Sequence, residues 1–316
     1  MFLAVLIATV AAPPTLGGWV VFWNSDSPAR FIERADRFAE VLPEWFTMTE
    51  AGDVVRASPE HAVRRAELLR TARKHQVRVL GMATNYGPNG FDPARMTKML
   101  QDPAVRARHI ATLVRFAKAD GLNGVDLDYE SMRAEDRAAF SGFVRELGTA
   151  MRRAKLHLSV TVHPKDAEPG NWDGPKAQDW AAIGRAADSV RVVAYDFSWA
   201  DSEPGPIAPD DWVRRVMTFA KTVIPAAKLR LGVPAYGYDW STKPARSLTY
   251  GDFLSLDPAN RDASTIDAAN GERIVGKARF SGREAMRRKL ALAESLGIPG
   301  ISFWYVGSED PEFWTP

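Results

Sequence analysis

Short β-rich runs alternate with amphipathic helical stretches along most of the chain, and no linker or low-complexity tract interrupts them after Gly18. This alternation is typical of a parallel sheet covered by helices. Eight strands is the number that closes a (β/α)8 TIM barrel, which is the α/β fold predicted here. The runs that indicate strands are Trp19–Trp23, Trp45–Thr49, Val77–Ala83, Gly124–Tyr129, His157–His163, Val190–Asp196, Arg230–Ala235 and Gly300–Trp304.

Helix boundaries are marked by capping residues between these runs. Ser58-Pro59 and Asp102-Pro103 each set an N-cap residue before a proline, which suits the first helical position. A doubly wound open sheet would give a similar alternation, but no glycine-rich nucleotide fingerprint follows the first strand. After the seventh strand we expect a short loop and hairpin insertion, with Asn270-Gly271 as its turn.

The first residues predict an export signal. Residues 1–12 are almost entirely apolar, too short to span a bilayer and followed by Pro13-Pro14. A positive n-region is missing, and a buried first strand is the alternative. We assign residues 1–17 to a signal peptide with a short linker and residues 18–316 to one catalytic barrel. The mature protein is then expected to be secreted, periplasmic or associated with the cell wall, and not to span the membrane.

Composition removes several classes of function. The chain has 316 residues, 46% of them hydrophobic, and a formal net charge of +2. This near-balance of charge argues against nucleic-acid binding, which usually needs a clustered basic surplus. With no cysteine, thiol nucleophiles and zinc–cysteine sites are excluded. We expect a monomer.

The segment from Gly124 to Glu130 holds the candidate chemistry. Because strand side chains alternate between faces, Asp126, Asp128 and Glu130 point to one side. In a barrel they face the interior, rising toward the C-terminal mouth. Buried carboxyl groups are costly unless they share protons, bind cations or perform chemistry. A magnesium or calcium cluster and a solvated edge strand are the alternatives at this point.

This segment resembles the signature D-G-x-D-x-D-x-E of glycoside hydrolase family 18, with Asn123 in place of the first Asp. Further likeness runs from about Gly18 to the C-terminus and includes Tyr195-Asp196 and the last strand, which ends at Trp304. The segment Leu231 to Trp240 is most similar to bacterial members that act on spore or cell-wall peptidoglycan. The S-x-G-G motif of many chitinases is absent at the third strand. Peptidoglycan and chitin both stay open as substrates.

The resemblance implies a substrate-assisted, retaining glycosidase that needs neither metal nor cofactor. Its partner would be a polysaccharide with β-linked N-acetylglucosamine. Glu130 would be the acid/base, Asp128 would orient the substrate's acetamido group, and Asp126 would share a proton with Asp128. Tyr195 would bind the acetamido oxygen. The expected sugar-binding residues are Asp196, Trp304 and Tyr236.

Two other functions remain open. A barrel of this type that lacks the acid would be a carbohydrate-binding, lectin-like protein, since a fold alone does not deliver activity. The presence of Glu130 favours the enzyme. A metal-dependent hydrolase using the acidic strand is the second rival, and EDTA insensitivity would eliminate it. Asn123 should lie at the start of its strand and affect packing more than chemistry.

Overall fold

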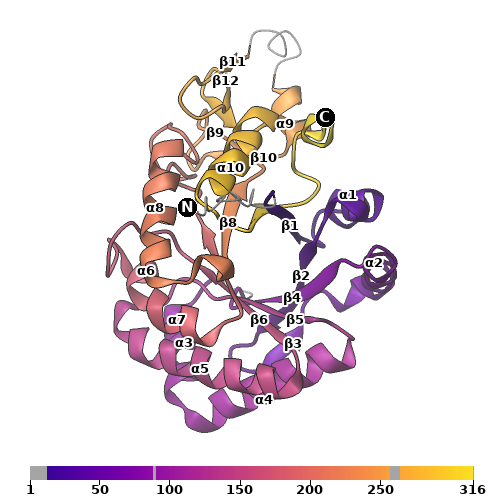
Figure 1. Cartoon of the computed structure of the whole chain (residues 1–316), viewed down its shortest axis with the longest axis vertical. Coiled ribbons are helices and arrows are strands. Elements are labelled where there is room, and N and C mark those ends of the chain that lie inside the picture. The colour runs from indigo at the N-terminus through magenta and orange to yellow at the C-terminus, as the bar shows by residue number, and fades with distance from the viewer. Residues whose placement is uncertain (1–12, 88–89, 257–263, 316) are drawn as a thin grey trace, which may run out of the picture.

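The main sheet of the molecule is a closed barrel (Figure 1). The computed structural model describes residues 13–87, 90–256 and 264–315. Eight parallel strands pair in sequence around the ring, and β1 pairs with both β14 and β2 to close it. The predicted (β/α)8 fold is therefore confirmed. The barrel strands are β1 (Thr15–Val20), β2 (Glu40–Met48), β4 (Arg78–Thr84), β5 (Gly124–Asp128), β6 (His157–Val162), β7 (Ser189–Val193), β8 (Leu229–Pro234) and β14 (Gly300–Trp304), and β3 (Val54–Arg56) adds antiparallel to β2.

Helices form a ring around the barrel and bury their apolar faces on it (Figure 1). In α5 the buried side chains include Phe140, Phe143, Val144 and Leu147, which recur at the spacing that one helical face requires. The helices are α1 (Asp26–Arg34), α2 (Ala62–Lys74), α3 (Pro93–Gln101), α4 (Pro103–Ala119), α5 (Arg137–Ala154), α6 (Asp173–Ala177), α7 (Trp180–Ala186), α8 (Asp210–Val223), α9 (Tyr250–Ser255) and α10 (Arg283–Ser295).

The first strand lies earlier than expected. β1 spans Thr15–Val20, so the prediction of a strand at Trp19–Trp23 was wrong by about four residues. Gly17 and Gly18 lie inside the strand because they allow close packing. A Cβ atom at Gly17 would lie 2.9 Å from Ser302 Oγ, and one at Gly18 would lie 2.6 Å from Val306 Cγ2.

The two predicted helix caps differ in outcome. Asp102 caps α4, and its carboxylate accepts hydrogen bonds from the backbone N–H groups of Ala104 and Val105. Ser58 precedes only a single turn of 3₁₀ helix, Pro59–His61, and its side chain makes no capping bond. That half of the prediction was wrong, since Ser58 adopts a left-handed backbone conformation that does not suit a cap.

The segment after the seventh barrel strand is larger than a hairpin. Asn270-Gly271 does form a turn, with Gly271 at φ +78° and its N–H bonded to Asp267 O. This turn, however, belongs to a five-stranded antiparallel sheet at the top of Figure 1. The sheet and α9 share a small core of Leu248, Phe253, Ala278 and Phe280. Its strands are β9 (Gly237–Asp239), β10 (Arg246–Leu248), β11 (Thr265–Ile266), β12 (Arg273–Val275) and β13 (Ala278–Phe280).

Residues 1–12, which make up most of the predicted signal peptide, lie outside the described residues, so its export role stays a prediction. β1 begins at Thr15, within the stretch assigned to the linker. In the part of the chain that the structure describes, no helix combines the length and apolar character needed to cross a membrane.

Gly124 at the start of β5 is expected to tolerate no side chain. A Cβ atom there would lie 2.0 Å from the backbone oxygen of His157 on β6, which cannot rotate away. Gly124→Ala should therefore lower the free energy of unfolding by at least ~1–3 kcal/mol, the usual cost of overpacking. Urea denaturation measures this. The matched control is Gly142→Ala in α5, where the nearest atom would be 3.9 Å away. It should be neutral or stabilising, because alanine is the better helix former.

Candidate active site

The alternation predicted for β5 is confirmed. Val125, Leu127 and Tyr129 pack in the outer core under the helices, whereas Asp126 and Asp128 are buried on the inner side. Asn123 lies at the strand's N-terminal end, where its side-chain oxygen accepts a hydrogen bond from Val79 N at 2.8 Å. Asn123, the residue that departs from the family motif, thus links β5 to β4 and does not line the cavity at the barrel mouth.

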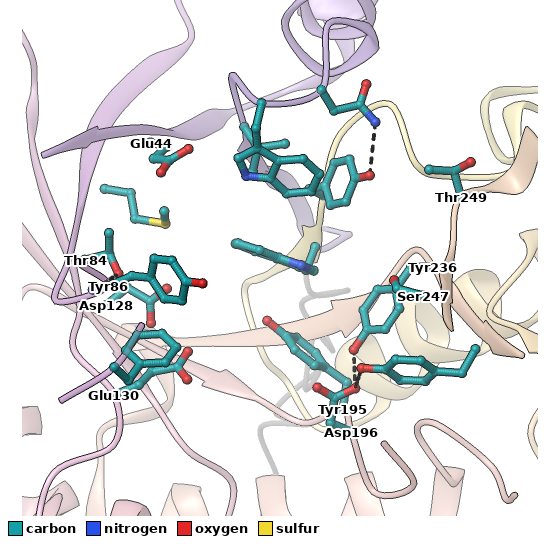
Figure 2. Close-up of a pocket in the computed structure, with 18 of the residues that line it drawn as sticks. Glu44, Thr84, Tyr86, Asp128, Glu130, Tyr195, Asp196, Tyr236, Ser247 and Thr249 are labelled. Carbon is teal, nitrogen blue, oxygen red and sulfur yellow. Dashed lines mark hydrogen bonds between the residues drawn. The ribbon is translucent and has the colours of Figure 1, made fainter. Parts of the chain in front are cut away.

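A cavity of about 870 Å³ opens at the C-terminal mouth of the barrel. Six of the seven predicted site residues line it, and Figure 2 shows Asp128 and Glu130 across from Tyr195, Asp196 and Tyr236. Asp126 does not line the cavity. The predicted residues that do are Asp128, Glu130, Tyr195, Asp196, Tyr236 and Trp304.

Asp126 lies deeper in the barrel, surrounded by hydrogen-bond donors. Thr161 Oγ1 and Trp19 Nε1 donate to it at 3.0 Å and 3.3 Å, and Ser159 donates to its other oxygen. The guanidinium of Arg191 is 3.5 Å away and completely buried. Four donors thus surround the two oxygens of Asp126 and hold its side chain in place.

Asp128 has the opposite environment. Its Oδ1 is buried and has no hydrogen-bond partner, and the residue borders the cavity. Burial, followed by the nearby negative charges of Glu130 and Asp126, raises the pKa of Asp128 well above its ordinary value. Any proton shared along β5 is therefore expected to reside on Asp128, where it can be used in the cavity.

Glu130 is held at its backbone and left free at its carboxyl group. Asn85 donates to Glu130 O at 2.7 Å and accepts from Glu130 N at 2.9 Å. Burial and the charge of Asp196 raise the pKa of Glu130 to about 7. A carboxyl group that keeps its proton near neutral pH can act as a general acid.

Asp196 adopts φ +57°, a left-handed conformation that aspartate tolerates better than most residues. Its Oδ1 accepts hydrogen bonds from Tyr236 and, at 3.1 Å, from Tyr238. The turn directs the carboxylate into the cavity, where its charge acts on Glu130. Tyr195 packs edge-on against Tyr236, with ring centroids 6.1 Å apart.

Several functional residues were not predicted. Exposed aromatic side chains at the cavity rim include Trp23, which follows β1, and Tyr86 and Phe91, which both follow β4. No spacing in the sequence brings Trp23 together with the other two. Asn85 was missed too, although an asparagine directly after a predicted strand was a usable signal. The other unpredicted residues that line the cavity include Glu44, Tyr238, Thr249, Asp252 and Tyr305.

A buried ion network lies below the cavity. Arg191 on β7 bonds Glu40 on β2 as well as Asp126, and Arg78 and Arg230 lie 3.5 Å and 3.7 Å from Glu40. These arginines lower the pKa of Glu40 despite its burial, which acts in the raising direction. The network fixes the position of Asp126 beneath Asp128.

The acidic strand is not arranged as a metal cluster. Within residues 13–87, 90–256 and 264–315, no group of three or more His, Cys, Asp or Glu side chains is placed to hold a metal ion. The acidic side chains that line the cavity are thus available for proton transfer and hydrogen bonding.

The mouth of this TIM barrel therefore holds a cavity lined by aromatic rings, with the carboxyl groups of Asp128 and Glu130 side by side in its wall, and such a site suits a glycosidase. Comparison with known proteins agrees. Residues 19–309 match the glycosyl hydrolases family 18, and the chain belongs to that family.

The relatives of this chain include Bacillus glycosylases and lytic enzymes as well as chitinases. The chain is 26% identical over 291 residues to YvbX, an uncharacterized glycosylase of Bacillus subtilis, covering 87% of this chain and 82% of the relative. It is 27% identical to the cortical fragment-lytic enzyme of the same species, over 73% of this chain and 57% of the relative. A class V chitinase of Pseudomonas fluorescens superposes with a TM-score of 0.85 at 25% identity, over 96% and 98% of the two chains.

The pH dependence should report Glu130. Because the acid must hold its proton, kcat/KM should fall as pH rises through about 7. In Asp196→Asn the negative charge that raises this pKa is removed, so the falling limb should move to lower pH. A pH profile of kcat/KM for both proteins tests this. An unchanged limb in the variant would mean that Asp196 does not control the acid.

Loss of Arg191 should destabilise the barrel. Arg191→Met leaves two buried carboxylates without their shared cation, and removing one partner of a buried pair costs about 3–5 kcal/mol. Chemical denaturation gives the value. Arg64→Met is the control, because its ion pair with Glu67 is exposed and should contribute little. Equal stability of the two variants would contradict the role given to the network.

Proposed function

We propose that this family member hydrolyses polysaccharides containing β-linked N-acetylglucosamine, with retention of anomeric configuration, by substrate-assisted catalysis. The observation that carries the proposal is the pair of neighbouring carboxyl groups on one strand. In Glu130, at the cavity wall, burial and the charge of Asp196 raise the pKa to about 7, and Asp128 keeps an oxygen without a partner.

In the first step, Glu130 donates its proton to the glycosidic oxygen as the bond from that oxygen to C1 breaks. The oxygen of the 2-acetamido group forms a new bond to C1 from the opposite face and closes an oxazolinium ring. Glu130 is left as a carboxylate. Its pKa of about 7 supports both roles, since it is then a usable acid before the step and a usable base after it.

Asp128 is proposed to act on the acetamido group. In its protonated or ionised form it can meet the acetamido N–H, where positive charge develops as the ring closes. Tyr195, whose hydroxyl is in the same cavity, would donate to the acetamido oxygen. Trp304 would form the apolar floor under the sugar ring, since aromatic faces pack well against the C–H groups of a pyranose.

Water completes the reaction. It attacks C1 from the face that the leaving group vacated, and Glu130 takes its proton. The bond from C1 to the acetamido oxygen breaks, which opens the ring and restores the acetamido group, so two inversions give net retention. Asp196, held by Tyr236 and Tyr238, would bind the sugar at the cutting position and keep the pKa of Glu130 high.

The names of relatives support the substrate class. The relatives include a cortical fragment-lytic enzyme and a class V chitinase. Both names indicate an enzyme that acts on a polymer containing N-acetylglucosamine. We also propose that the enzyme works outside the cytoplasm as a monomer, with the apolar N-terminal residues as its export signal.

The acetamido group should be obligatory. Chitin oligomers should be cut to a product whose first-formed anomer is β, whereas fully de-N-acetylated oligomers should stay intact. Proton NMR during the first minutes of the reaction measures both the anomer that forms first and the extent of cleavage. In Glu130→Gln, the matched control, the rate should fall by about 10²–10⁴-fold, because the amide cannot supply a proton. A first-formed α anomer, or cleavage without acetyl groups, would show direct attack by water or a protein carboxylate. Binding without cleavage by the wild type would indicate a lectin.

A further inference from the structure

The charge of the cavity wall is one-sided. Five carboxyl groups line the cavity, from Glu44, Asp128, Glu130, Asp196 and Asp252. Among its described lining residues there is no lysine, arginine or histidine. This contrasts with the whole chain, whose formal net charge is +2. A ligand in this cavity therefore meets hydrogen-bond acceptors and aromatic rings, and no cation.

Four of these five carboxyl groups already have a task. Asp196 accepts from two tyrosines, and Asp252 forms a capping box with Thr249, accepting from its backbone N at 2.9 Å. Asp128 and Glu130 belong to the proposed chemistry. Glu44 is the one left over, and its Oε2 is buried without a hydrogen-bond partner.

The position of Glu44 on β2 explains its isolation. Glu40, Leu42 and Glu44 alternate onto the inner face of the barrel, so the two acids sit at different heights in the same interior. Glu40, at the N-terminal end, has three arginines around it. Glu44, near the mouth, forms none of the ion pairs found within the described residues.

The nearest cations to Glu44 are turned away from its carboxylate. Arg65 uses its Nη2 on the backbone oxygens of Ala57 and Glu44, and its guanidinium lies over the Trp45 ring, 4.8 Å from the centroid. His61 stacks on Phe22 at 5.7 Å. Burial outweighs the charge of Arg65 and a backbone hydrogen bond from Phe22, and it raises the pKa of Glu44. Glu44 lines the cavity, so its carboxyl group faces a ligand there without a cation paired to it.

We propose that Glu44 is a specificity-determining residue that makes this cavity select glycan segments without a carboxylate. The inference rests on the proposed function and narrows it. Sugar hydroxyl or amide groups can donate to the carboxyl group of Glu44. A carboxylate on the sugar cannot donate, and it would lie beside the carboxyl group of Glu44 in a cavity whose described lining residues offer no cation in return.

This separates two kinds of N-acetylated polymer. Chitin segments are uncharged, whereas each N-acetylmuramic acid unit of a peptidoglycan strand carries a lactyl carboxylate unless that group is capped by an amide. Strands whose lactyl groups are capped should enter the cavity, and strands with free carboxylates should be disfavoured. Discrimination of this kind works by repulsion of the wrong ligand, with little gain for the right one.

The test uses one glycan in two charge states. Strands of alternating N-acetylglucosamine and N-acetylmuramic acid are prepared with free lactyl groups and with the same groups converted to neutral methyl amides. The wild type should cut the amide strand with a kcat/KM about tenfold or more above that of the free-acid strand, since juxtaposed like charges cost at least one such factor. In Glu44→Gln the ratio should shrink toward one, and in Glu44→Lys it should reverse.

Glu146→Gln is the matched control. It changes the net charge by the same amount on the exposed side of α5, where Glu146 pairs with Arg106. Its ratio should equal that of the wild type. Equal kcat/KM values for the two strands with wild type, or an unchanged ratio in Glu44→Gln, would overturn the inference.

Binding to the inactive Glu130→Gln variant separates this inference from the proposed function. Calorimetric titration should show weaker binding of the free-acid strand, and adding Glu44→Gln should abolish the difference. If no strand and no chitin oligomer is cut but this preference holds, only the proposed function fails. If chitin oligomers are cut and both strands bind equally, only the charge selection fails.

Discussion

The structure depends on how a closed barrel neutralises the acidic groups in its interior. Arg191, completely buried, is shared between Glu40 on β2 and Asp126 on β5, two strands that are separated in the ring by β4. Desolvating such charges is expensive, and only close geometry with further donors offsets the cost. The serine and threonine hydroxyls around Asp126 supply those donors. The carboxyl group of Asp126, beneath Asp128, is thereby fixed in place.

Burial governs the groups above Asp126. Asp128 lies next along the inner face of β5, where burial, followed by the negative charges of Glu130 and Asp126, raises its pKa. Glu130 follows at the mouth, where Asp196 adds another negative charge. Successive inner positions of one segment therefore change from a carboxyl group surrounded by donors, Asp126, to carboxyl groups whose pKa is raised, Asp128 and Glu130.

Much of this arrangement was predictable, because strand alternation is local. The facing of Asp126, Asp128 and Glu130 followed from a period of two, and family resemblance identified Tyr195, Asp196 and Trp304. Arg191 was not predictable, since it lies in a valine-rich run and its partner Glu40 is 151 residues away. The start of β1 was misjudged because two glycines read as a break, although in the barrel they allow close packing. The sheet of the insertion pairs distant segments, β9 with β13, which a single turn signal cannot show.

The distribution of cations links acid strength to substrate charge. Arg78, Arg191 and Arg230 meet around Glu40, and two of them lie at the N-terminal ends of their strands, far from the mouth. A cation at the mouth would bind an anionic sugar, but it would also stabilise the ionised form of Glu130 and remove its proton near neutral pH. An acid with a pKa of about 7 and a pocket for carboxylates are therefore competing requirements in one cavity. Because these three arginines lie around Glu40, away from the mouth, the barrel meets the requirement for an acid with a pKa of about 7. The cavity lining is then acidic, and the proposed selection against charged sugars falls to Glu44.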